Sequence, residues 1–181
     1  MYLGKRIMIL GSSGSGKSTL ALKLSQITGI PVVHLDRLLW NPGWVQTPQD
    51  EYGKKVNEAA LEESWIIEGN NSKTLDFRLQ RADCVIFLDF NRFFCIYRIF
   101  KRRIKNHGKT RPDMTEGCPE KIDLEYLRFV WNFPKRFRKT ALEKACNSGK
   151  AFYHLKSRRQ VAKFIEKARG LEGYDDGKRQ T

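Results

Sequence analysis

The stretch GSSGSGKSTL (residues 11–20) decides the fold, and it directly follows the apolar run RIMIL (6–10). It contains three glycines, four serines and a threonine, and its single apolar side chain is Leu20. Such a segment adds almost nothing to a hydrophobic core, so its backbone must explain its position. Glycine lacks a Cβ, which permits left-handed conformations and close approach by another group. The stretch therefore predicts a tight loop between a strand and a helix that begins near Gly16.

The pattern G-x-x-x-x-G-K-[ST] runs from Gly11 to Ser18, in the strand–loop–helix context of a phosphate-binding P-loop. Backbone N–H groups of such a loop face phosphate oxygens, and the positive end of the following helix points at the same anion. We expect Lys17 to reach the β- and γ-phosphates of ATP, Ser18 to ligate Mg²⁺, and Thr19 to contact the α-phosphate. The other loop residues expected to bind the nucleotide are Gly11, Ser12, Ser13, Gly14, Ser15 and Gly16. The alternative is a flexible Gly/Ser linker, which the flanking strand and helix disfavour.

Five short runs rich in branched apolar residues are predicted strands: 6–10, 31–35, 64–69, 84–90 and 151–155. The first four are nearly continuous in apolar character, which is typical of strands covered on both faces. Helical patterns lie between them, at 17–27, 48–63, 92–105, 119–147 with an interruption near Pro134, and a last helix carrying Val161, Phe164, Ile165 and Ala168. Alternating strands and helices predict an α/β, three-layer P-loop NTPase fold with a parallel five-stranded sheet.

Two details of these helices matter later. Thr47 is expected to cap the helix over 48–63, with Pro48 in its first turn. In 92–105, Phe93, Ile96, Tyr97, Phe100 and Ile104 repeat at helical spacing, while Arg98, Arg102 and Lys105 fall on the opposite face.

The length of 181 residues suits one domain over 1–170, with a small basic helical lid at about 98–125 and a polar, disordered tail over 171–181. No apolar run approaches the ~20 residues that cross a bilayer, and the N-terminus does not resemble a signal peptide. The four cysteines are scattered, which disfavours a disulfide framework or a zinc ribbon. We therefore expect a cytoplasmic protein that does not bind a membrane.

The formal net charge is +14, from 34 Lys and Arg against 20 Asp and Glu. Such an excess indicates anionic partners, either nucleic acid or phosphorylated small molecules.

Several strings together resemble the adenylate-kinase-like nucleotide kinases and, more closely, bacterial DNA topology modulation proteins related to the flagellin-regulation protein. The strings are GSSGSGKSTL, VVHLDRLLWNPGW, WIIEGN, LDFRLQRADCVIFLDF, YRIFKRR with GKTRPDMTEGCPEKID, and HLKSRRQV, within residues 5–165. The resemblance implies an ATP-binding, kinase-like protein. It departs from adenylate kinases at EGNNSK (68–73), where those enzymes have Asp-Gly-Phe-Pro-Arg, which puts AMP as the acceptor in doubt.

Acidic residues follow three of the predicted strands. Asp36 is expected to accept the proton of an attacking hydroxyl and to contact the acceptor, with a helix N-cap as the alternative role. Glu68 ends a buried run, where a cation near the γ-phosphate would relieve the cost of burying a carboxylate, with a salt bridge to an arginine as the alternative. Asp89 competes with Glu68 as the residue that organises the metal.

The acceptor is further expected to contact Trp44, Arg78 and Arg111, although Trp44 can equally pack a loop and Arg78 can be a solvated surface residue. From Arg92 to Arg111 there are eight Lys and Arg and no Asp or Glu. We expect Arg102 to act on the phosphate in transfer and Arg98 to bind the nucleotide, as lid arginines of small kinases do. A solvated helix face and a nucleic-acid patch are the alternatives.

The sequence thus favours a phosphotransferase that uses ATP and Mg²⁺ on a small-molecule acceptor, a nucleotide, nucleoside or other hydroxyl compound. The alternatives are a nucleic-acid-associated ATPase that affects DNA topology and a nucleotide-binding regulator with little turnover. If the protein is a kinase, we expect it to contact nucleic acid at most through non-specific charge attraction.

Overall fold

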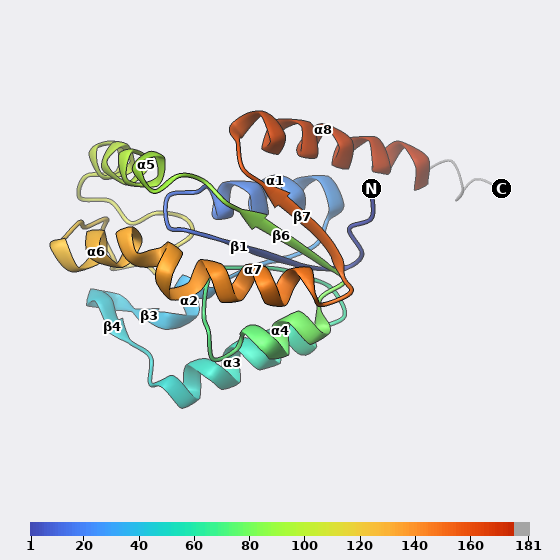
Figure 1. Ribbon diagram of the computed structural model, residues 1–181. Helices are drawn as coiled ribbons and strands as arrows, with labels where there is room; N and C mark the ends of the chain where they lie inside the picture. The colour runs from blue at the N-terminus through green and yellow to red at the C-terminus, as the bar shows by residue number, and fades with distance from the viewer. Residues whose placement is uncertain (176–181) are drawn as a thin grey trace.

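The computed structural model describes residues 1–175, with side chains through 170. Its centre is a parallel five-stranded sheet in the order β2-β5-β1-β6-β7 (Figure 1). The strands are β1 (Arg6–Gly11), β2 (Val32–His34), β5 (Trp65–Glu68), β6 (Cys84–Leu88) and β7 (Ala151–Leu155). All five strands were predicted, and the α/β three-layer class is confirmed.

The strands are covered on both faces, as their continuous apolar character predicts. Every residue of β5 and β6 is buried. Ile9 pairs with Glu68 of β5 and Gly11 pairs with Leu88 of β6, so the carboxyl ends of three neighbouring strands meet at one edge of the sheet. This edge carries the P-loop.

Helices form a layer on each side of the sheet (Figure 1). α1 (Lys17–Thr28) and α8 (Arg158–Asp175) share one core with the sheet. On the other face lie α3 (Gln49–Leu61), α4 (Leu75–Arg81), α6 (Leu124–Phe133) and α7 (Lys139–Cys146). The short helix α2 (Leu35–Leu39) follows β2 directly.

Helix α5 (Arg92–Lys105) has the bounds that the sequence predicts, but its apolar stripe faces outward. Phe93, Tyr97, Phe100 and Ile104 are exposed, Ile104 to 80%. The buried pair is instead Cys95 and Ile99, which pack with Val130 of α6. The arginines on the opposite face therefore turn toward the P-loop rather than toward solvent.

The predicted helix over 119–147 is divided. Residues 119–123 are not helical, and a π-helical segment (Pro134–Arg138) separates α6 from α7. Proline lacks the N–H that an α-helix needs at this point, so the interruption falls where the sequence places it.

The helix cap predicted at Thr47 is wrong. Pro48 occupies the N-cap position of α3, and Thr47 Oγ1 donates to the carbonyl of Leu38 (2.9 Å). Thr47 thereby closes a small hairpin that the sequence did not reveal, formed by β3 (Trp40–Asn41) and β4 (Val45–Gln46) around a 3₁₀ turn (Pro42–Trp44).

Helix α8 continues to Asp175, through the first residues of the segment predicted to be a disordered tail, and residues 176–181 lie outside the described part. Among the described helices, none has the length and apolar character needed to span a membrane.

Candidate active site

The loop after β1 has the backbone that its glycines permit. Gly11, Gly14 and Gly16 have φ angles of +145°, +79° and +101°, where other residues are strained. A Cβ on Gly16 would lie 2.9 Å from Arg98 Nη1. α1 begins at Lys17, directly behind this turn, so the loop and the helix N-terminus form the cradle expected of a P-loop.

A cavity of about 380 Å³ opens on this cradle. Most of the sequence-predicted site residues line it: Ser13, Gly14, Gly16, Lys17, Ser18, Thr19, Asp36, Glu68, Arg98, Arg102 and Arg111. It is also lined by Leu22, Lys101, Lys105, Asn106, Pro112, Asp113 and Tyr126, which were not singled out from the sequence.

Glu68 stands at the centre of a short polar chain at the floor of the cavity. Its Oε1 accepts a hydrogen bond from Ser18 Oγ (2.9 Å) and lies 2.8 Å from Nδ1 of His34. Both Glu68 and His34 are buried. No arginine or lysine pairs with Glu68 in the described chain, so its predicted alternative, a salt bridge to an arginine, is not formed. A hydroxyl and a carboxylate side by side are oxygen ligands of the kind that Mg²⁺ takes in proteins.

Asp36 lies in the first turn of α2, and His34 holds the N-cap position, so Asp36 is not the cap of this helix. Its side chain is exposed in the cavity, where the surrounding protein walls exclude much of the bulk solvent. This desolvation raises the pKa of the Asp36 carboxyl above its ordinary value, and the like charge of Glu68 adds to the effect. Lys17 and Arg111 act in the opposite direction. The carboxyl is therefore more basic than that of an aspartate surrounded by bulk water.

The basic side of the cavity comes from residues within 98–125, the segment predicted to be a lid and called the lid below. Arg98 donates from Nη1 to the carbonyl of Ser15 (3.3 Å), which attaches α5 to the P-loop. Desolvation, with the nearby charges of Arg158 and Arg102, lowers the pKa of Arg98. Arg98, Arg102 and two lysines of α5 line the cavity together.

Glu120 joins the two further lid arginines. It is buried and lies 2.8 Å from Arg102 Nη2 and 2.6 Å from Arg111 Nε. Arg102 Nη2 also donates to the hydroxyl of Tyr126 (3.1 Å), and Arg111 pairs with Asp113 (2.9 Å). Burial alone would raise the pKa of Asp113, but Arg111 and the Ser18 hydroxyl hold it below its ordinary value. Arg102 and Arg111 are thus already paired with carboxylates from the same segment.

Trp44 lies away from the cavity. Its Nε1 donates to the carbonyl of Pro119 (3.1 Å), its ring packs edge-on against Trp40, and Lys121 lies over it. Trp44 therefore connects the β3–β4 hairpin to the lid, which corresponds to the loop-packing alternative.

Arg78 is fully buried and does not line the cavity. It donates to Thr74 Oγ1 (3.3 Å) and to the carbonyls of Gly69 (3.3 Å) and Asn71 (3.1 Å). Desolvation lowers its pKa to about 10. Arg78 thus fixes the loop after β5, and it is not the solvated residue that the sequence allowed.

Asn70, which positions the P-loop, was missed in the sequence: its Nδ2 donates to the carbonyl of Gly11 (2.7 Å), and its Oδ1 accepts from the N–H of Gly11 (3.3 Å). His34, which contacts Glu68, was not singled out either. The only available signal was that Asn70 follows β5 and that His34 ends β2, the strand beside β5. Among the described residues, no cluster of three or more His, Cys, Asp or Glu forms a metal site of its own.

Comparisons with known proteins agree with this architecture. A family model described as isopentenyl transferase matches residues 5–42, and no curated protein matches the chain. A gluconokinase from Sinorhizobium meliloti 1021 superposes with a TM-score of 0.55 at 16% identity, over 100% of this chain and 99% of that one. Shikimate kinase from Acinetobacter baumannii, in complex with shikimate, gives 0.56 at 12% identity, over 95% and 94%. Deoxyadenosine kinase from M. mycoides gives 0.51 at 18% identity, over 89% and 97%. The chain has the fold of the P-loop kinases.

Proposed function

We propose that this protein transfers the γ-phosphoryl group of ATP to a hydroxyl of a small-molecule acceptor. One observation carries the proposal: Lys17, Ser18, Asp36 and Glu68 line a single cavity whose opposite wall is formed by basic residues of the lid. A P-loop alone accounts for nucleotide binding. The additional carboxylate with a raised pKa accounts for a phosphate acceptor that must lose a proton.

The nucleotide would bind with its phosphates in the cradle of the P-loop, with Lys17 at the β- and γ-phosphates and Arg98 along the phosphate chain. Ser18 and Glu68 would hold Mg²⁺, Ser18 directly and Glu68 directly or through a water molecule. When bound, the ion neutralises charge on the β- and γ-phosphates. The fit rests on the 2.9 Å contact between the two side chains and on the lack of an arginine beside Glu68 in the described chain.

Asp36 would accept the proton of the attacking hydroxyl. In that step the acceptor oxygen forms a bond to the γ-phosphorus, the bond from phosphorus to the β–γ bridging oxygen breaks, and the proton passes to a carboxylate oxygen of Asp36. A raised pKa strengthens Asp36 as a base, since general-base efficiency increases as the pKa approaches the working pH.

Arg102 and Arg111 would stabilise the negative charge of the phosphoryl group during its transfer. Preorganised cations in a site that excludes water stabilise charge far better than they do in bulk solvent. In the described chain, Arg98, Lys101, Arg102 and Lys105 all line the cavity, which supports a lid more than an outward-facing nucleic-acid patch.

The acceptor would be a nucleotide, a nucleoside or another hydroxyl compound. The neighbours of the same fold carry the names gluconokinase, shikimate kinase and deoxyadenosine kinase, so the fold is compatible with very different acceptors. The resemblance to DNA topology modulation proteins stays a prediction and names no acceptor.

The test is a panel of hydroxyl acceptors incubated with γ-labelled ATP and Mg²⁺. We expect labelled product with at least one acceptor for the wild type, a loss of about 10²–10⁴-fold for Asp36→Asn, and no product for Lys17→Ala. Calorimetry should give Asp36→Asn nearly the ATP affinity of the wild type, because Asp36 acts on the acceptor.

Asp50→Asn, on the exposed start of α3, is the matched control and should keep full activity. Transfer by Asp36→Asn at the wild-type rate would remove Asp36 from the mechanism. ATP binding by Lys17→Ala at wild-type affinity would remove the P-loop assignment itself.

A further inference from the structure

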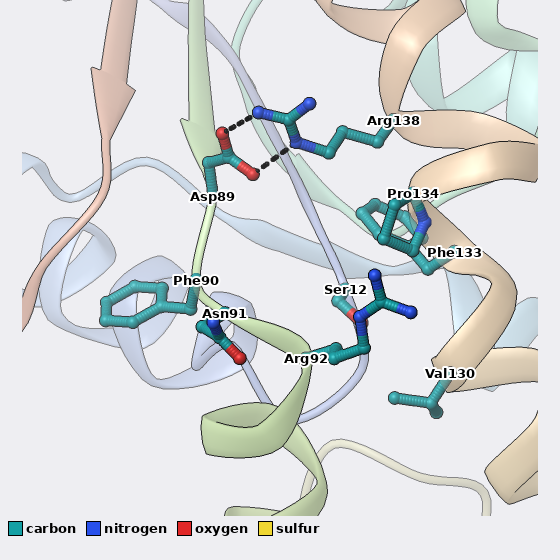
Figure 2. A pocket seen from close by; sticks show the side chains of 9 residues that line it. All are labelled: Ser12, Asp89, Phe90, Asn91, Arg92, Val130, Phe133, Pro134 and Arg138. Carbon is teal, nitrogen blue, oxygen red and sulfur yellow. Dashed lines mark hydrogen bonds and ion pairs between the residues drawn. The ribbon is translucent and has the colours of Figure 1, made fainter.

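A second cavity, of about 290 Å³, also touches the P-loop, through Ser12, and shares no lining residue with the cavity described above. Figure 2 shows its lining side chains, which come from the P-loop, the residues between β6 and α5, the first residue of α5, α6 and the π-helical segment. Its lining residues are Ser12, Asp89, Phe90, Asn91, Arg92, Val130, Phe133, Pro134 and Arg138. The proposed phosphoryl transfer uses none of these side chains.

Ser12 brings an unsatisfied polar group to this cavity. The residue is 4% exposed, and its Oγ has no hydrogen-bonded nitrogen or oxygen partner. The sulfur of Cys95 lies beside it and is only a weak partner. The carbonyl of Ser12 faces the other way and accepts from Lys17 Nζ (3.2 Å). A buried hydroxyl without a good partner costs free energy, and a bound ligand would supply the missing acceptor.

Arg92 brings a positive charge that no carboxylate neutralises within the described chain. Its guanidinium stacks on the ring of Trp131, 4.6 Å from the centroid, which fixes its plane. The other charges of the cavity cancel: Asp89 makes two 2.7 Å bonds to Arg138, drawn in Figure 2, and a 2.7 Å contact to His154. The net charge that the lining offers to a ligand is therefore a single positive charge.

The start of α5 points into the same space. Asn91 is the N-cap of this 14-residue helix, and its Oδ1 accepts from the N–H of Phe93 (2.8 Å). The positive end of the helix adds to the attraction for an anion. The π-helical segment that begins at Pro134 forms part of the opposite wall, and such segments are frequent at functional sites.

The remaining wall is apolar, formed by Phe90, Val130, Phe133 and Pro134. The volume lies at the lower end of the ~300–1,000 Å³ that is usual for small-molecule sites. One positive charge, one hydroxyl and an apolar wall match a compact molecule with one negative group at one end.

We propose that this cavity is a binding site for a small apolar carboxylate, with the carboxylate held by Arg92 and Ser12 and the apolar body packed against α6. The planar guanidinium suits the two oxygens of a carboxylate, which it binds in a fork. The proposed transfer assigns its acceptor to the cavity that contains Asp36, with which this cavity shares no lining residue. The inference does not depend on phosphoryl transfer, because its readout is binding.

The test is a calorimetric titration of the full chain with phenylacetate, with ADP present so that the P-loop is occupied. We expect binding at one site, an affinity at least about 10-fold weaker for Arg92→Ala, and an intermediate loss for Arg92→Lys, which keeps the charge but not the fork. Arg136→Ala is the matched control, because Arg136 also lies over an aromatic ring, that of Phe129, but does not line the cavity. It should bind as the wild type does.

Two further ligands separate the alternatives. Phenylacetamide, which lacks the charge, should bind much more weakly, and equal binding would overturn the anion assignment. Phenyl phosphate should not bind better than phenylacetate with ADP present, and a clear preference for it would overturn the carboxylate class. Amide shifts of Ser12 and Val130 on titration should locate the ligand. A wild type that does not bind phenylacetate at millimolar concentration, or an Arg92→Ala variant that binds it equally well, would end the proposal.

Discussion

Glu68 and Asp89 are close counterparts with opposite surroundings. Glu68 ends β5 and Asp89 directly follows β6, the two strands that flank β1. Each is largely buried, and each contacts a histidine, His34 or His154. Asp89 is neutralised by a two-bond pair with Arg138, whereas Glu68 has only a hydroxyl and an imidazole as partners. From sequence they compete for one role. The structure separates them by whether the charge is already compensated.

A buried carboxylate that is paired with a bidentate arginine mainly stabilises the fold, since its charge is neutralised within the protein. A buried carboxylate without such a partner keeps an uncompensated negative charge, which a bound cation can neutralise. On this reasoning we propose that Glu68 takes part in the reaction and that Asp89 stabilises the fold, and single substitutions can test this division.

Among the substitutions that test this contrast, Glu68→Gln is expected to have the largest effect. The amide keeps the shape and can still contact Ser18, but it loses the charge that would hold Mg²⁺ or its water. We expect turnover to fall on the order of 10²-fold, with a higher Mg²⁺ concentration needed for half-maximal rate. The measurement is a magnesium titration of ATP-dependent transfer.

The free energy of unfolding of Glu68→Gln should change little, or rise, because an uncompensated buried charge is removed. A clear loss of stability with an unchanged dependence of turnover on Mg²⁺ would contradict this prediction. Glu68 would then stabilise the fold as Asp89 does, and the two residues would not differ in role.

Asp89→Asn should show the reverse pattern. The amide keeps one acceptor oxygen but loses the negative charge and one of the two oxygens that accept from Arg138, and we expect a loss of about 2 kcal/mol in unfolding free energy by urea titration. This is below the ~3–5 kcal/mol of a fully buried pair, because the Arg138 side chain is 39% exposed. The turnover of the folded variant should stay within about twofold of the wild type. This is a small effect, because ~1.4 kcal/mol of activation free energy corresponds to a tenfold change in rate.

The control for Asp89→Asn is the same comparison of unfolding free energies at low pH. Burial alone would raise the pKa of Asp89, but hydrogen bonds from Arg138 and His154 hold it below its ordinary value. A depressed pKa gives stability that is present above the unfolded pKa of ~3.9 and is lost as pH falls through the folded value. The difference in stability between wild type and Asp89→Asn should therefore shrink below about pH 4. A difference independent of pH would mean that packing, not charge, is involved.

The smallest effect is expected for the stability of Asp36→Asn. The raised pKa of Asp36 means that its ionised form is disfavoured in the folded protein, so the carboxylate destabilises the fold at neutral pH. The variant should show a slightly higher urea midpoint than the wild type, measured without Mg²⁺. That gain should vanish as pH falls through the raised pKa toward ~3.9, where both folded and unfolded chains are protonated. A lower midpoint at neutral pH would show that Asp36 is stabilising, and hence framework like Asp89.

The sheet and the P-loop could be predicted because their signals are local. RIMIL followed by GSSGSGKS predicts a strand, a loop and the start of a helix within a few residues, and the other strands are recognisable as continuous apolar runs. Asp36 and Glu68 were found in the same way, as acids that follow such runs. Their partners could not be found, because Ser18 and His34 meet Glu68 only once three strands are aligned in register.

The lid illustrates the limit of periodicity. The spacing of Phe93, Tyr97 and Phe100 shows that they share a face of α5, but not that this face is exposed. Its orientation depends on Cys95 and Ile99 packing against α6, a contact between segments some 30 residues apart for which the sequence gives no local signal. Glu120 was missed for the same reason, since its importance comes only from the two arginines that the folded lid brings to it.

Glu120 has a consequence for how the lid would meet ATP. Arg102 and Arg111 are not bare cations waiting for a phosphate, because each already has this carboxylate within 2.8 Å. In the proposed function, the γ-phosphate therefore enters by counter-ion exchange, displacing Glu120 from at least one guanidinium. Such an exchange releases a buried carboxylate, so it favours ligands with several negative charges over those with one. If the proposed function holds, the lid would discriminate by valence, and a singly charged anion such as chloride would be a poor competitor for the same arginines.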